Sequence, residues 1–115
     1  MNKRESAFIE KIKEFMEVQD DCVERLEESF EFIRYRNITR RSEIERLLDK
    51  VLSMMPTDKT VDLYTRICLY YHSIDKEAAM DYAQYYLEMY DDDSVIRKII
   101  DVEENMRRMK KYGKI

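Results

Sequence analysis

Hydrophobic positions recur along the first third of the chain at alternating spacings of four and three residues. This series runs through Phe8, Ile12, Phe15, Gln19, Cys22, Leu26, Ser29 and Ile33, and a second series repeats every seven residues at Ile9, Met16, Val23 and Phe30. Both series fall on one side of a helix. The pattern predicts a helix over about residues 4–35, about 45 Å long at ~1.5 Å per residue. Asp21 with Glu24 resembles a capping box that would divide it, but the stripe keeps its phase there, so we expect one continuous helix.

A helix of this length overhangs a small fold, and its apolar stripe permits two arrangements. In the favoured one the helix packs lengthwise against the rest of its own chain. In the other, the stripe pairs with a second copy and forms a homodimer through the N-terminal helix, because its spacing is also that of a coiled-coil seam.

Four shorter apolar stripes follow an elbow at residues 36–41, and each predicts a helix. The predicted ranges are about 42–55, 58–73, 76–91 and 94–112. The first of these helices would begin with a capping box of Ser42 and Glu45 and end before Pro56. Thr57 or Asp58 would cap the second helix, and Asp75 the third. The run Asp91-Asp92-Asp93-Ser94 would separate the third helix from the fourth, and Gly113 would cap the end of the fourth.

Composition supports an all-α fold. Glycine and proline each occur once in 115 residues, whereas β-hairpins depend on such residues for their turns. Charged residues make up 40% and hydrophobic ones 44%, as in amphipathic helices with solvated outer faces. We therefore predict about five helices in a single domain over residues 1–115, arranged as an antiparallel bundle or as a short stack of helical hairpins.

One stretch of sequence is similar to a known repeat. Residues 78–87, Ala-Ala-Met-Asp-Tyr-Ala-Gln-Tyr-Tyr-Leu, resemble the second helix of a tetratricopeptide repeat in the spacing of small, aromatic and leucine residues. The likeness covers about residues 61–93, without the glycine before the turn or the proline after the second helix. It implies a helical hairpin of the kind found in protein-binding scaffolds.

Tyrosine is concentrated in the same region, where seven of the nine lie between Tyr64 and Tyr90. These tyrosines either lie at the edge of the core with their hydroxyls in solvent, or they form part of a protein–protein interface, in which tyrosine is enriched. Residues 75–93 also hold seven acids against one lysine. The candidate partner-binding residues are Tyr70, Tyr71, Asp81, Tyr85, Tyr86, Glu88 and Tyr90.

Basic residues form two clusters in a chain whose net charge is −4. The first comprises Arg34, Arg36, Arg40 and Arg41, and the second Arg107, Arg108, Lys110, Lys111 and Lys114. The favoured interpretation is that they neutralise helix C-termini and face solvent. The alternative is an anion or nucleic-acid contact at the elbow.

Catalytic and metal-binding patterns are scarce. Cys68 and His72 share a helix face at metal-capable spacing, but the chain has one histidine, so we interpret them as a core cysteine beside a partly exposed histidine. With glycine only at position 113, no phosphate-binding loop is present. We expect no enzyme activity, metal or cofactor, and we expect Cys22 and Cys68 to be free, mostly buried thiols.

These patterns favour a non-enzymatic protein-interaction module, such as a small adaptor, inhibitor or regulatory subunit, that presents the acid-rimmed tyrosine hairpin. The alternative is a nucleic-acid-associated regulator using the Arg34–Arg41 elbow and the basic C-terminal tail. No apolar run approaches the roughly 20 residues that span a bilayer, and the first residues lack a signal-peptide pattern, so we expect a cytoplasmic protein without membrane contact.

Overall fold

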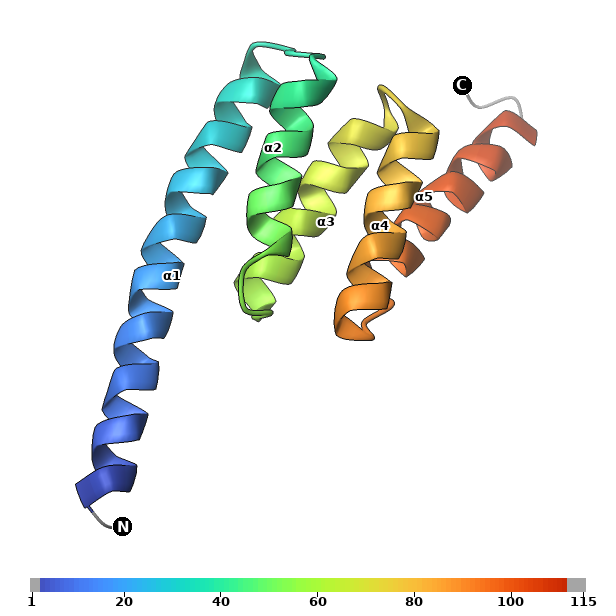
Figure 1. The fold of residues 1–115 in the computed structure, drawn as a ribbon. Coiled ribbons are helices and arrows are strands. Elements are labelled where there is room, and N and C mark those ends of the chain that lie inside the picture. Colours follow the sequence, from blue (N-terminus) through green and yellow to red (C-terminus); the bar gives the residue numbers. More distant parts are fainter. Residues whose placement is uncertain (1–2, 112–115) are drawn as a thin grey trace.

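The structure is a computed structural model that describes residues 3–111, and these form five α-helices (Figure 1). The helices are α1 (Lys3–Tyr35), α2 (Arg41–Leu52), α3 (Asp58–His72), α4 (Lys76–Tyr90) and α5 (Ser94–Lys111). The all-α fold and the long first helix are confirmed. α1 passes through Asp20 and Asp21 without a break, as the constant phase of its stripe predicts.

The N-caps of α3 and α4 are those that the sequence predicts. Thr57 and Thr60 cap α3 reciprocally, each side chain bonding to the other's backbone N–H, and the Asp75 carboxylate accepts a hydrogen bond from the Ala78 N–H. At the other end of α4, Asp91 adopts a left-handed conformation with φ of 52°.

The expected ends of α2 are wrong. α2 begins at Arg41 after an extended Arg40 that provides no side-chain cap, so Ser42 and Glu45 lie inside the helix rather than forming a capping box. It ends at Leu52, three residues before the predicted end, because Ser53 and Met54 turn the chain ahead of Pro56. The C-cap expected at Gly113 lies outside the described residues.

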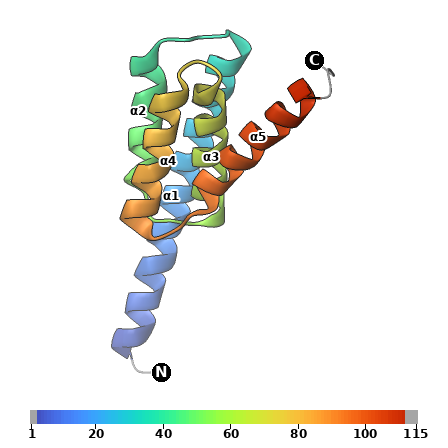
Figure 2. The same ribbon diagram turned by 90° about the vertical axis from the view of Figure 1, so that its right-hand side faces the viewer.

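The helices form a stack of antiparallel hairpins around α3, which contacts each of the other four (Figures 1 and 2). α1 and α5 lie on either side of α3, at opposite ends of the array, and α2 and α4 cover another side of it. Of the two predicted arrangements, the structure therefore has the hairpin stack, in which the end helices do not close on each other.

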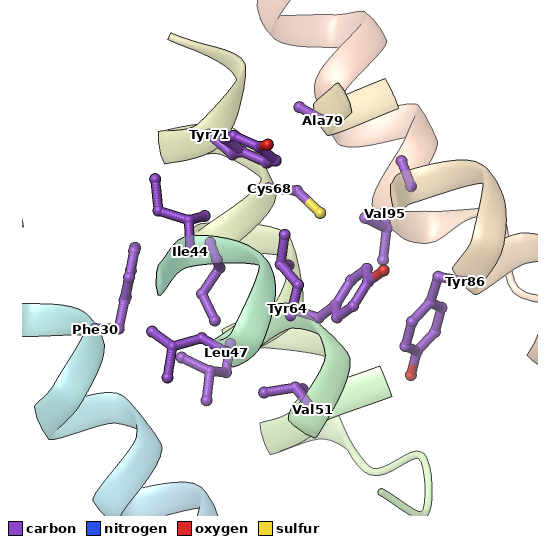
Figure 3. Packing of buried hydrophobic residues seen from close by; sticks show 14 of the residues in the cluster. Phe30, Ile44, Leu47, Val51, Tyr64, Cys68, Tyr71, Ala79, Tyr86 and Val95 are labelled. Atoms are coloured by element: carbon purple, nitrogen blue, oxygen red, sulfur yellow. The ribbon is translucent and has the colours of Figure 1, made fainter. Parts of the chain in front are cut away.

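The core is one cluster of buried side chains that surrounds α3 (Figure 3). Its largest fully buried members are Tyr64, Tyr71, Tyr86, Phe30, Ile44, Leu48, Leu63, Ile67 and Ile99. Ala79 and Ala83 of α4 are fully buried as well. Tyr64 and Tyr86 pack with their ring centroids 4.8 Å apart, which joins α3 to α4.

The first half of α1 takes no part in this core. Residues 3–18, which we call the N-terminal projection, are all exposed and extend alone beyond the other helices in both views (Figures 1 and 2). The molecule consequently measures 65 × 28 × 21 Å. The favoured expectation, that α1 packs lengthwise on its own chain, holds only from Gln19 onward and is wrong for the projection.

Candidate interaction surfaces

The apolar stripe of α1 is covered over one half of its length and uncovered over the other. In the covered half it buries residues at spacings of four and three, namely Gln19, Val23, Leu26, Phe30 and Ile33. Continuing the same spacing toward the N-terminus leads to Met16, Ile12 and Ile9, which are exposed, with Phe8 and Phe15 beside them. We call these five exposed residues the seam.

The rest of the chain covers the stripe only as far as Gln19, where the α2–α3 connection lies against α1. The Gln19 Nε2 donates to the Met55 carbonyl at 2.9 Å, and its Oε1 accepts from the Met55 N–H at 2.9 Å. Asp20 next to it forms an ion pair with Lys59 at 3.6 Å. Both halves of a buried amide are thus satisfied, which fixes the point where α1 leaves the stack.

The seam is an unusual surface for a protein of this size. Phe8 is 64% exposed and Phe15 55%, and Ile12 between them is 38% exposed. Val18 is 63% exposed but lies about 120° around the helix from the centre of the seam, at 100° per residue. Contiguous large apolar side chains on a surface are typical of interaction sites, whereas scattered ones are not.

The tyrosines of α3 and α4 connect the helices of the stack. Five of their hydroxyls donate to groups far away in the sequence. Three donate to backbone carbonyls: Tyr64 to Tyr82 at 2.6 Å, Tyr70 to Ile38 at 2.8 Å, and Tyr90 to Leu52 and Met54. Two donate to carboxylates: Tyr71 to Glu45, and Tyr82 to Asp49 at 2.9 Å. Burial raises the pKa of Tyr64 and Tyr82, and raises that of Tyr86 to about 12, so these phenols stay neutral.

This placement corrects most of the tyrosine-rich surface expected from the sequence. Tyr71 and Tyr86 are fully buried, and Tyr70 and Tyr90 are half-buried with their hydroxyls bonded to backbone carbonyls. A partner cannot reach the first two without unfolding the core.

Three of the candidate partner-binding residues remain exposed, and all are on α4. They are Asp81, Tyr85 and Glu88, with Met89 exposed beside them, and we call these four residues the α4 face. Tyr85 is 46% exposed, and its ring packs edge-on against Tyr82 at 5.4 Å. The face is acidic, but it exposes less large apolar surface than the seam does.

The arginines of the elbow are largely engaged within the chain. Three of the four pair with carboxylates, Arg34 with Glu31 at 3.2 Å, Arg40 with Glu43 at 3.4 Å, and Arg41 with Glu45 at 3.8 Å and Asp75 at 3.3 Å. Arg36 lies over the Phe32 ring, 5.4 Å from its centroid. The four guanidinium groups are exposed, but most of their charge is already compensated locally.

The basic C-terminal cluster lies on α5. Arg107, Arg108 and Lys110 are exposed, and Arg107 approaches Glu103 at 3.9 Å. The side chain of Lys111 and the whole of Lys114 lie outside the described part of the chain. A shallow hollow of about 120 Å³ near this cluster is lined by His72, Lys76, Glu103, Met106, Arg107 and Lys110.

His72 and Cys22 differ from expectation, whereas Cys68 is buried as expected. His72 is buried rather than partly exposed, and its Nε2 lies 2.7 Å from Glu103 of α5, a bond that lowers the pKa of that carboxyl. Cys68 is buried, which raises the pKa of its thiol, whereas Cys22 is exposed instead of buried. Among residues 3–111, no three His, Cys, Asp or Glu side chains are grouped so that they could hold a metal ion.

No protein-family model, curated protein or solved structure matches the chain. None of the helices within residues 3–111 is long and apolar enough to cross a membrane. Sequence reasoning located the apolar stripe of α1 but missed where its cover ends. Gln19, a polar residue within the stripe, lies at the boundary between its two halves, but Ser29 is a second polar residue in the same series, so polarity alone did not locate the boundary.

Proposed function

We propose that the chain is a non-enzymatic protein-interaction module whose main contact surface is the seam on the N-terminal projection. The observation that carries this proposal is the continuity of the stripe, since one helix face is core from Gln19 to Ile33 and uncovered from Phe8 to Met16. Burying such a face releases water from apolar surface and favours association. The partner that fits it is another amphipathic helix laid along the seam.

The groups that could perform chemistry support a non-catalytic role. Cys68 is buried and its pKa is raised, so it holds little thiolate at neutral pH. The one histidine is buried against Glu103, which engages its Nε2. Both residues act as parts of the core in this arrangement.

The experiment that tests the proposal is affinity capture from a lysate of the native organism with the full chain as bait. The test variant is Ile12→Glu with Phe15→Glu, which places two charges in the seam. The control is Val18→Glu, which places a charge at an exposed apolar position off the seam. The helical stack of all three proteins should have the same melting temperature, because none of these side chains lies in the core.

The proposal predicts that the double variant loses captured protein by at least tenfold while Val18→Glu retains it. Capture that is the same for the wild type and the double variant would contradict it. Nuclease treatment of the lysate is a second arm, and binding that disappears only with nuclease would favour the nucleic-acid alternative instead.

The α4 face is the second candidate contact surface of the same module. Asp81 and Glu88 flank Tyr85 on exposed helix, an arrangement that suits a basic partner segment. Reversing both charges with Asp81→Lys and Glu88→Lys should weaken capture of such a partner and make the remaining binding less sensitive to salt. Unchanged capture and salt dependence would exclude this face.

The nucleic-acid alternative has less support in the geometry. A basic surface binds phosphates by exchanging their counterions, and arginines already paired with carboxylates contribute little to that exchange. Arg34, Arg40 and Arg41 are paired in this way. Arg36 and the exposed Arg108 and Lys110 remain as its basis.

A further inference from the structure

We infer that the occupant of the seam is a second copy of this chain, bound antiparallel, so that the N-terminal projections of two chains lie side by side with their N-termini in opposite directions. This inference rests on the proposed function, because it names the partner of the same surface. Three features of the projection support it, namely the position where the seam ends, the distribution of charge along it, and the apolar area that it exposes.

The end of the seam favours the antiparallel direction. The Met55 backbone bonds to Gln19 and covers the stripe there, so a helix lying in the seam has to stop near residue 18. In an antiparallel pair the partner's N-terminus arrives at this point and the partner helix ends. In a parallel pair the partner helix continues along its own residues 19–35 and collides with the stack.

The charges along the projection favour the same direction. Glu5 continues the seam four residues before Ile9, about 20° from the centre of the seam at 100° per residue, so it lies on the side that faces a partner. If the two 16-residue projections overlap fully and antiparallel, Glu5 of one chain lies opposite Met16 of the other. A parallel pair would instead place the two Glu5 carboxylates opposite each other, which is unfavourable.

The exposed apolar area is sufficient for a reversible dimer. Taking roughly 175 Å² for a fully exposed large apolar side chain, the five seam residues expose about 400 Å² per chain. A standard interface buries roughly 800 Å² per partner, of which a little over half is apolar. The overlap is about 24 Å long at ~1.5 Å per residue, so pairing would cover the whole length of the seam.

Pairing also supplies what an isolated helical extension lacks. Helices of about 16 residues are marginal in water without tertiary contacts, and the residues of the projection are all exposed on a helix that extends away from the stack. Phe8 and Phe15 from each copy can pack across the partner's Ile12, which converts an uncovered helix into a two-stranded one.

The first experiment is sedimentation velocity of the full chain from about 1 to 300 µM. The expected result is a monomer at the lowest concentration that becomes a dimer as the concentration rises. The variant Ile12→Glu, whose side chain is 38% exposed and outside the core, should weaken dimerisation at least tenfold, and Val18→Glu should change it less than twofold. A wild-type monomer throughout this range, or a dimer insensitive to Ile12→Glu, would overturn the inference.

The second experiment determines the direction by cysteine cross-linking in a Cys22→Ser background, in which Cys68 is buried and does not interfere. Glu5→Cys mixed with Met16→Cys should form a mixed disulfide dimer upon mild oxidation, and Glu5→Cys alone should form little. The reverse pattern, with rapid disulfide formation by Glu5→Cys alone, would overturn the antiparallel arrangement.

The two proposals fail in distinguishable ways. A monomeric wild type that still captures a partner through the seam would overturn the second copy as the occupant and leave the interaction module intact. A seam whose double variant Ile12→Glu with Phe15→Glu changes neither capture nor sedimentation would contradict both.

Discussion

Tyrosine hydroxyls are the polar connections that hold this stack together. Each of the five donates to a carbonyl or carboxylate on another segment, so that a ring filling the core also bonds the next helix or connection. A buried hydroxyl without such a bond costs free energy, whereas a satisfied one contributes modestly. Tyr86 is the exception, because its buried hydroxyl has no hydrogen-bond partner among the described residues.

This contrast gives a matched prediction at the residue scale. Tyr64→Phe removes a hydroxyl that donates at 2.6 Å to the Tyr82 carbonyl, and should lower the free energy of unfolding by about 1 kcal/mol. Tyr86→Phe removes an unsatisfied hydroxyl and should leave stability unchanged or raise it by up to about 1 kcal/mol. Urea unfolding of both variants measures the difference, and a larger loss for Tyr86→Phe would contradict the assignment.

The sequence indicated that these tyrosines matter but not how they act. Their number in residues 64–90 is visible in the sequence, whereas their acceptors are backbone carbonyls such as those of Ile38 and Leu52, which any residue type provides. Composition therefore could not separate an interface from an internal network. The exposure of Cys22 could not be predicted for a similar reason. Cys22 lies at the edge of the apolar stripe, and the sequence does not show which edge the other helices leave exposed.

At the scale of elements, α1 is one helix in two environments, and Gln19 lies at their boundary. Its amide exchanges two hydrogen bonds with the Met55 backbone, which anchors the α2–α3 connection to α1. Periodicity predicts a helix and the direction of its apolar side, but the same period continues on both sides of Gln19. How much of the stripe is covered depends on how far the other helices extend along α1, and the sequence of α1 does not contain that information.

Removing this anchor gives a prediction for α1. Gln19→Ala should lower the free energy of unfolding by roughly 1–3 kcal/mol, because it removes the partner of the Met55 N–H and one of the two donors to the Met55 carbonyl, the other being the Thr60 hydroxyl. Gln84→Ala, on the exposed side of α4, is the control and should change it by less than about 0.5 kcal/mol. Chemical denaturation measures both, and equal effects would contradict the role of Gln19.

The attachment of α5 to α3 gives a prediction about pH. Glu103 has a lowered pKa in the folded state because of its bond with His72, so its stabilising contribution is present above its unfolded pKa of about 4.3 and is lost as the pH falls through the lower folded value. The stability difference between the wild type and Glu103→Gln should therefore be largest near neutrality and shrink below about pH 4. A difference that stays constant from pH 7 to pH 3 would contradict this linkage.

At the scale of the whole molecule, an open stack leaves end helices that a closed bundle would cover. α1 packs against α3 and α2, and α5 packs against α3 and α4, so each end helix has neighbours on one side; α1 in addition extends past every other helix (Figure 1). The number, order and type of the helices could be predicted from the stripes and caps. The open arrangement could not, because bundles and hairpin stacks share the same amphipathic pattern.

The seam follows from this arrangement. It is the part of the α1 stripe that the short helices α2 and α3 are not long enough to reach, and within residues 3–111 its apolar residues are the largest exposed group of their kind on one continuous helix face. α1 thus contributes to the core with one half and, with the other, exposes an apolar face that no described residue covers.

The most direct test of the seam is hydrogen exchange with mass spectrometry on the full chain at about 1 µM and 200 µM. We predict that peptides from residues 3–18 exchange rapidly at the low concentration and become protected at the high one, while peptides from the core of α3 stay protected at both. The variant Ile12→Glu should abolish the concentration dependence. Equal exchange of the N-terminal projection at the two concentrations would contradict the pairing of two chains through the seam.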